Sequence, residues 1–125
     1  MSGLLLDSSV LIDYLRNRPS AIDFLDRLTE RVAVSVITTA ELYAGVRDGA
    51  EETRVDGLLT RVLVRDVDLT IARLAGRFRR EYRQRHGVAI PDALIAATAE
   101  VHGARLVTRN ARHFPMLADV LVPYP

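Results

Sequence analysis

The sequence contains neither cysteine nor lysine. Without cysteine there are no disulfide bonds, no thiol nucleophiles and no thiolate metal sites. Without lysine, every mechanism that needs an amine side chain is excluded, and all 17 basic residues are arginine. The chemistry of the protein must therefore rest on carboxylates, hydroxyls, amides, histidine and arginine.

Long hydrophobic runs are also missing. No apolar stretch approaches the ~18 residues that a membrane span requires. The N-terminal MSGLLLDSSVLIDYL has no basic region, and Asp7 interrupts its apolar residues, so a signal peptide is not expected. The 125 residues, 49% hydrophobic and 26% charged, are typical of a soluble globular protein. We therefore expect a single domain over residues 1–125, in the cytoplasm.

Short apolar runs alternate with amphipathic segments along the chain. The runs predict strands at residues 4–7, 31–35, 64–68, 104–108 and 119–123. Helical spacing predicts helices at residues 9–17, 21–28, 38–49, 51–63, 70–87 and 91–103, with glycines at 49, 87 and 103 as stops. Strands that alternate with helices favour a parallel sheet covered on both faces. The predicted class is an α/β three-layer sandwich.

Polar residues follow the predicted strands, where α/β sheets bind their ligands. Asp7 ends the first strand, and Thr108 and Asn110 follow the fourth. Glu41 is expected in the first turn of the helix after the second strand, and Asp92 in the first turn of the helix behind Pro91. We expect these side chains to share one edge of the sheet.

Each acid also has a purely structural explanation. Asp7 has the position of a helix N-cap. Thr38-Thr39-Ala40-Glu41 matches a capping box, and Asp92 would complement the helix dipole. Ser9 also has an N-cap interpretation. Taken singly, these explanations are the stronger ones, but three carboxylates at one edge repel each other unless a positive charge lies between them.

A divalent cation would remove that repulsion. Mg²⁺ and Mn²⁺ prefer carboxylate oxygens, and such an ion can activate a bound water and neutralise charge on a phosphate. The three histidines are scattered without zinc-site spacing. The acids therefore indicate metal-dependent phosphodiester cleavage without a side-chain nucleophile.

Four segments together resemble a known family. LLLDSSVLIDYL, SVITTAELYAG, PDALIAATA and LVTRNARHF are similar to the signature blocks of PIN-domain ribonucleases, in order, from Leu4 to Phe114. Within that family the chain most resembles the VapC toxins of type II toxin–antitoxin pairs. The resemblance implies a PIN-like three-layer α/β/α sandwich, with a short parallel sheet of four or five strands. It also implies a homodimer, an assembly with a cognate VapB antitoxin, and an RNA substrate, such as tRNA or another structured RNA.

The resemblance implies a role for each block. Its catalytic and metal-binding positions are Asp7, Glu41 and Asp92, which would hold one or two Mg²⁺ or Mn²⁺ ions. A secondary set of site residues comprises Ser9, Thr108, Asn110 and His113. Relatives often carry an acid where this chain has His113, and this difference leaves the number of metal ions open.

Arginines are the candidates for binding the RNA backbone. The helix predicted at residues 70–87 carries six of them, including Arg80 and Arg83, and a solvated helix face explains such a charge run about equally well. Arg109 and Arg112 flank Asn110 and are better placed to contact a scissile strand. We therefore take Arg80, Arg83, Arg109 and Arg112 as RNA-contact candidates, because guanidinium groups bind phosphate in bidentate fashion.

Three other functions fit parts of the pattern. A phospho-accepting receiver domain also clusters acids, but it needs a lysine that this chain lacks. A non-catalytic RNA- or protein-binding module on the same scaffold would bind divalent ions without turnover. A DNA-directed nuclease would prefer DNA over RNA.

Overall fold

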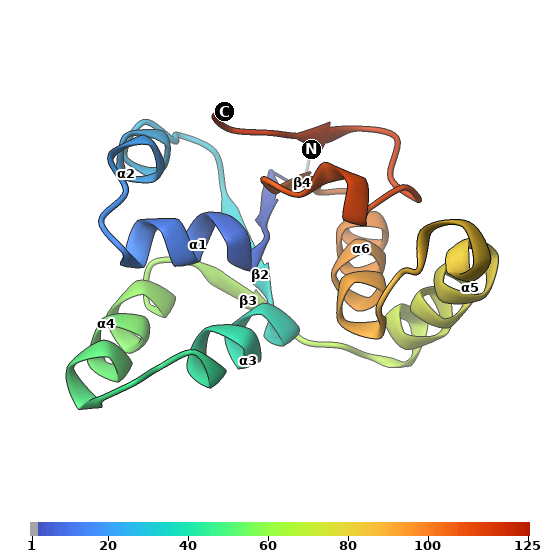
Figure 1. The fold of residues 1–125 in the computed structure, drawn as a ribbon, viewed down its shortest axis with the longest axis horizontal. Coiled ribbons are helices and arrows are strands. Elements are labelled where there is room, and N and C mark those ends of the chain that lie inside the picture. Colours follow the sequence, from blue (N-terminus) through green and yellow to red (C-terminus); the bar gives the residue numbers. More distant parts are fainter. Residues whose placement is uncertain (1–2) are drawn as a thin grey trace.

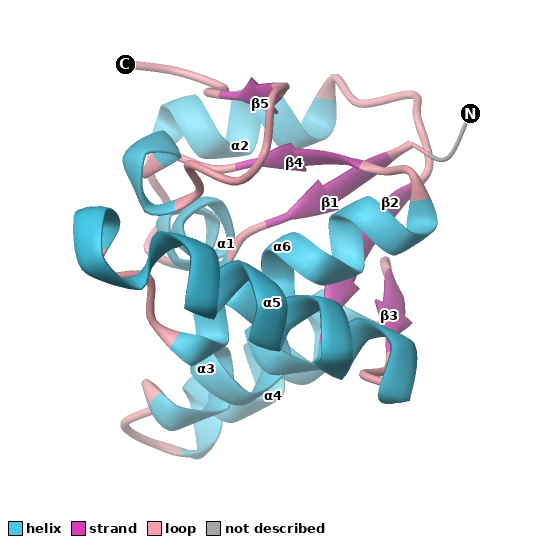
Figure 2. Ribbon diagram, turned by 90° about the vertical axis from the view of Figure 1, so that its right-hand side faces the viewer, coloured by secondary structure: helices cyan, strands magenta, loops and turns pink. Residues whose placement is uncertain are grey.

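The computed structural model describes residues 3–125, apart from the side chains of residues 84–86. Its centre is a five-stranded sheet in the order β3-β2-β1-β4-β5, and every neighbouring pair of strands is parallel (Figure 2). The strands are β1 (Leu4–Leu6), β2 (Val32–Ser35), β3 (Leu63–Arg65), β4 (Arg105–Val107) and β5 (Val120–Leu121). The predicted α/β class is confirmed, and the sheet has five strands where four or five were predicted.

Alternate residues of β1 divide the core between two helical layers. Leu4 and Leu6 pack with α1, α2 and α4, whereas Leu5 packs against α6. Figure 1 shows these layers on opposite sides of the strands. The helices are α1 (Ser8–Leu15), α2 (Pro19–Asp26), α3 (Val36–Ala44), α4 (Gly49–Leu59), α5 (Leu69–His86) and α6 (Ile90–His102). This arrangement is the predicted three-layer sandwich, and it has no room for a polar side chain in β1.

The long helix α5 packs chiefly on α6. A seam of small residues, with Ala75 from α5 and Ala93 and Ala97 from α6, lets the two helices approach closely beside Ile71. Figure 1 accordingly shows α5 on the outer side of α6. Among residues 3–125, neither α5 nor any other helix is long and apolar enough to cross a membrane.

The third and fourth helices differ most from the sequence prediction, because both begin earlier and end earlier than expected. The third helix begins at Val36, where Ser35 is the N-cap and its hydroxyl accepts a hydrogen bond from the Ile37 amide at 3.0 Å. Thr38 is therefore not a cap, and Glu41 lies in the second turn and not in the first. Gly49 does not end this helix; it opens α4 behind Asp48, whose carboxylate accepts from the Glu51 amide at 2.8 Å.

We expect Ala97→Leu to destabilise the fold by overfilling the α5–α6 seam, because Ala97 is fully buried. The added carbons should cost about 1–3 kcal/mol of unfolding free energy. Urea denaturation followed by circular dichroism measures this. The exposed Ala72 on α5 is the matched control, and Ala72→Leu should change stability by less than ~0.5 kcal/mol. Equal stabilities of the two variants would contradict the described packing.

Candidate functional site

Strand register brings Asp7 and Thr108 together. Leu6 of β1 pairs with Val107 of β4 in parallel, so the next residue on each strand lies at the same edge of the sheet. Asp7 is only 5% exposed, and its Oδ2 accepts a hydrogen bond from the Thr108 hydroxyl at 2.7 Å. The expected convergence of these two side chains is therefore observed.

Ser9 connects the start of α1 to the loop after β4. Its hydroxyl donates to Asp7 Oδ2 at 3.1 Å and accepts from the Arg109 amide at 3.2 Å. The Thr108 hydroxyl oxygen in turn accepts from the Asn110 amide at 3.0 Å. Asp7, not Ser9, occupies the N-cap position of α1, but its side chain makes no capping hydrogen bond. The carboxylate of Asp7 is thus oriented by two hydroxyls instead of by helix amides.

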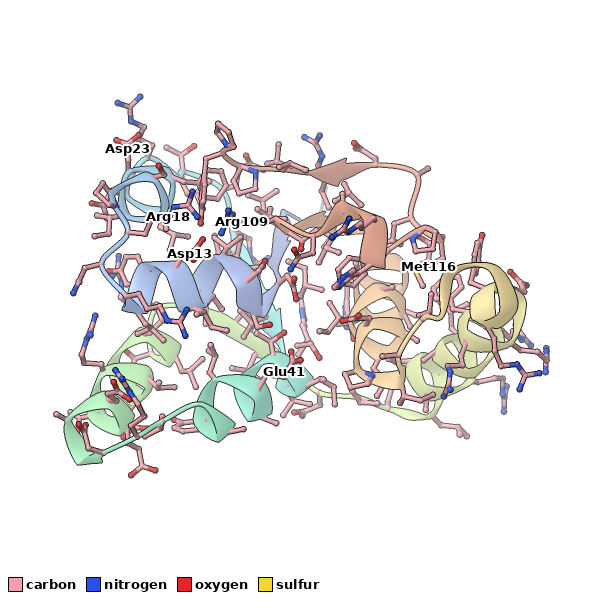
Figure 3. All side chains as sticks on the ribbon, viewed as in Figure 1. Asp13, Arg18, Asp23, Glu41, Arg109 and Met116 are labelled. Carbon is pink, nitrogen blue, oxygen red and sulfur yellow. The ribbon has the colours of Figure 1, made fainter. Side chains whose placement is uncertain are left out.

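Glu41 on α3 contributes a second carboxyl to this edge, and Figure 3 labels its place. Burial is the largest cause that raises its pKa above the ordinary value of 4.5, and the negative charge of Asp7 adds to this. A hydrogen bond from Ser8 lowers the pKa in part, while Asp92 raises it further. Glu41 Oε1 is buried and has no hydrogen-bond partner among the described residues. Such an oxygen is costly to bury unless something positive reaches it.

Asp92 contributes the third carboxyl from the first turn of α6, as predicted. Its pKa is raised, chiefly by burial and then by Asp7, and the nearby His113 acts in the opposite direction. His113 Nδ1 lies 3.7 Å from Asp92 Oδ2, so the histidine is close to the acidic group. Asp7 is therefore near enough to both Glu41 and Asp92 to disfavour their charged forms, although the three carboxyls come from separate elements.

The donors of this edge fit a divalent cation that keeps much of its water. Among the described residues, no three His, Asp or Glu side chains are already gathered closely enough to enclose a metal ion. Mg²⁺ does not need such an enclosure, because proteins commonly bind it through one or two carboxylates while it retains several waters. The unpartnered Glu41 oxygen and the raised pKa values of Glu41 and Asp92 are what a site short of positive charge would show.

The predicted RNA-contact arginines are not all alike. The Arg109 guanidinium donates from Nη1 to Asp13 Oδ2 at 2.9 Å and is therefore engaged within the protein. Arg112 is exposed in a short 3₁₀ turn, Ala111–His113, next to the acidic edge. Arg80 and Arg83 are exposed on α5, the helix outside α6. Sequence reasoning overlooked Ser8, Asp13 and Tyr124; the last two are 111 residues apart and share a hydrogen bond.

The chain is thus an α/β/α domain with a group of acidic side chains at the C-terminal edge of its short parallel sheet. The model of the PIN domain family matches residues 4–119, and the chain belongs to this family.

Relatives match nearly the whole chain. It is 41% identical over 124 residues to Ribonuclease VapC19 of Mycobacterium tuberculosis (strain ATCC 25618 / H37Rv), covering 96% of this chain and 98% of the relative. It is 29% identical to the tRNA(fMet)-specific endonuclease VapC of Shigella flexneri over 91% of both chains. A solved toxin–antitoxin complex from Klebsiella pneumoniae contains a chain with a TM-score of 0.84 and 31% identity, covering 97% of this chain and 98% of that one. A chain of the FitAcB structure from Neisseria gonorrhoeae has a TM-score of 0.73 and 30% identity, covering 96% of this chain and 97% of that one.

We expect Glu41→Gln to raise the melting temperature in metal-free buffer at pH 7. The folded protein raises the pKa of Glu41, so ionised Glu41 destabilises the fold above that pKa, and this cost is absent below the unfolded value near 4.5. The advantage of the variant should therefore disappear as the pH falls below that value. Differential scanning calorimetry between pH 4 and pH 7 measures it, with EDTA present.

Glu100→Gln is the matched control, because Glu100 is exposed on α6. A Glu41→Gln melting temperature that stays at or below the parent's at pH 7 would show that burial and the neighbouring carboxylates do not disfavour ionised Glu41 as described.

Proposed function

We propose that the chain is a metal-dependent endoribonuclease that acts as the toxin of a VapBC-type toxin–antitoxin pair. Support comes from relatives at 41–42% identity that are named ribonucleases, and from the toxin–antitoxin complex from Klebsiella pneumoniae. The substrate would be tRNA or another structured RNA, in line with the tRNA-specific relative from Shigella flexneri. Inhibition of translation and growth would follow from cleaving such an RNA.

The observation that carries this proposal is the convergence of Asp7, Glu41 and Asp92 at one edge of the sheet, with a buried Glu41 oxygen that has no hydrogen-bond partner among the described residues. These residues would hold Mg²⁺ or Mn²⁺, one ion or two, with Asn110 and His113 as further oxygen and nitrogen donors. When bound, the metal would supply an activated water and charge neutralisation at the scissile phosphate. Asp7, fixed by the hydroxyls of Ser9 and Thr108, would orient the centre, and the Glu41 oxygen without a partner would turn to it. The products would carry a 5′-phosphate and a 3′-hydroxyl.

Exposed arginines would hold the RNA backbone around this centre. Arg112 precedes His113 in the sequence and would contact phosphates beside the scissile bond. Arg80 and Arg83 would contact phosphates farther from that bond. The carboxylates make the centre itself negative, so arginines beside it would offset the repulsion of the RNA backbone.

A groove beside the acidic edge fits the antitoxin. A cleft of ≈ 580 Å³ runs between α1, α3 and α4, with Glu41 in its wall. Its lining combines apolar side chains with three arginines and two acids, and one of the arginines, Arg47, is paired with Glu51. The apolar members are Ile12, Leu15, Leu42, Val46 and Val55, and the other charged members are Arg16, Arg54 and Glu41. A VapB-type segment with apolar and acidic side chains would fill this cleft and cover Glu41. The proposed complex is a homodimer of toxins carrying antitoxin chains in a higher assembly in the cytoplasm.

We expect Asp92→Asn to lower the rate of RNA cleavage by roughly 10²–10³-fold, the usual cost of losing one group that stabilises charge in a transition state. EDTA should abolish cleavage by the parent, and added Mg²⁺ or Mn²⁺ should restore it. Purified protein with total RNA, followed by mapping of new 5′ ends, measures both effects.

The exposed Asp119, which pairs with Arg105 and precedes β5, gives the control variant Asp119→Asn, with parental activity. Equal cleavage by Asp92→Asn and the parent would reject the proposed role of the acids. Metal binding without any cleavage by the parent would favour a non-catalytic binding module, and faster cleavage of DNA than of RNA would favour a DNA-directed nuclease.

A further inference from the structure

A second carboxylate cluster lies outside the acidic edge, around Asp13 of α1. Its Oδ2 accepts three hydrogen bonds: from Arg109 Nη1 at 2.9 Å, from the Tyr124 hydroxyl at 2.8 Å and from Arg18 Nη1 at 3.2 Å. The Asp13 side chain is only 14% exposed. One carboxylate oxygen thus joins α1, the start of α2, the loop after β4 and the C-terminal segment. In Figure 3, Asp13, Arg18 and Arg109 lie together where these segments meet.

Tyr124 completes the cluster from its other side. Its ring is buried and lies beneath both guanidinium groups, 4.9 Å from Arg18 Cζ and 5.5 Å from Arg109 Cζ. Such stacking favours arginine over any apolar replacement. Burial, together with the bond to Asp13, raises the pKa of Tyr124 to about 12, so its hydroxyl remains a donor throughout the neutral range. Arg18 Nη2 also donates to the Pro125 carbonyl oxygen at 3.0 Å.

The cluster reaches the acidic edge through Arg109, in the loop after β4. Helix α1 holds Arg109 at two points one turn apart: Ser9 accepts its main-chain N–H at 3.2 Å, and Asp13 accepts its guanidinium. The preceding residue, Thr108, donates to Asp7, and the following residue, Asn110, is a proposed metal donor. A shift of the Arg109 side chain would therefore be passed to both neighbours through the backbone.

We propose that Asp13, Arg18 and Tyr124 form a clamp on Arg109 that fixes residues 108–110 against Asp7, so that Asp13 is a positioning residue for the acidic centre. A partly buried carboxylate with two arginines is a costly way to pack a helix against a terminus, because apolar side chains of similar volume do this as well or better. The charged cluster adds directional bonding, because all three donors bond to the same oxygen of Asp13. This fixes the position of the loop after β4 along α1. This assignment replaces the expectation that Arg109 contacts RNA.

The two possible roles of Arg109, as part of the clamp or as an RNA contact, predict different effects on kcat and KM. If the clamp positions the loop, Asp13→Asn should lower kcat for RNA by roughly ten- to a hundredfold, since small misplacements at an active site have effects of this size. KM should stay within about twofold of the parent's, because the clamp does not touch substrate. Tyr124→Phe keeps the ring but loses the donor, so it should act in the same direction and more weakly. The control is Asp23→Asn, since Asp23 forms an exposed pair with Arg27 on α2 and should leave kcat and KM unchanged.

The kinetic test rests on the proposed ribonuclease function. A measurement that needs no RNA cleavage tests the clamp independently of that function. Amide hydrogen exchange at Arg109 and Asn110 reports their bonds to Ser9 and Thr108. Asp13→Asn should speed exchange at both amides by roughly tenfold or more, while amides of β1 and β4 keep their parental rates because the fold persists. In an Arg109→Ala background, Asp13→Asn should change kcat no further, because the interaction it removes is already gone.

Parental exchange rates at Arg109 and Asn110 in Asp13→Asn would overturn the clamp. So would an increase in KM at unchanged kcat, which marks Arg109 as an RNA contact, or a full additional loss of kcat in the Arg109→Ala background. If the parent protein cleaves no RNA but Asp13→Asn still loosens the two amides, the clamp stands and the proposed function fails.

Discussion

Repulsion among Asp7, Glu41 and Asp92 is the constraint around which the rest of the molecule is arranged. Asp7 accepts hydrogen bonds from the hydroxyls of Ser9 and Thr108, whereas burial and the charge of Asp7 shift Glu41 and Asp92 toward the neutral form. A fold that places three carboxyls so unfavourably must hold them by its framework. The apolar layers on both faces of the sheet provide that framework, since they fix the ends of β1 and the start of α6.

The position of Asp7 and Thr108 was predictable from sequence, whereas that of Glu41 was predictable only in outline. Both Asp7 and Thr108 directly follow short apolar strands, and parallel pairing alone then places them at one edge. Glu41 was expected one turn too early, because Thr38 matched a capping pattern that Ser35 satisfies instead. Local patterns do not decide between two hydroxyl residues three apart; the end of β2 and the packing of Thr38 in the interior do.

The cluster around Asp13 could not have been predicted from local sequence at all. Its donors lie 5, 96 and 111 residues away along the chain, and no periodicity links them. Arg109 was therefore expected to contact RNA because it stands beside Asn110, whereas its bond to Asp13 belongs to a cluster that the folded chain completes with the C-terminal Tyr124. Residues that position a site from a distance carry no spacing signal, since only the folded topology brings them together.

Fixing Arg109 inside the protein also constrains how RNA would be bound. The guanidinium nearest in sequence to Thr108 is held by Asp13 and stacks on Tyr124, so under the proposed clamp arginines farther along the surface would contact the RNA backbone. Arg112 is exposed on one side of the acidic edge, while Arg16 and Arg54 line the cleft on the side of Glu41. In the proposed function, an RNA strand held by such arginines on both sides would cross the negative centre without any arginine entering it and neutralising the carboxylates. That separation would leave the repulsion for a divalent cation to relieve, as the proposed metal-dependent chemistry at this edge requires.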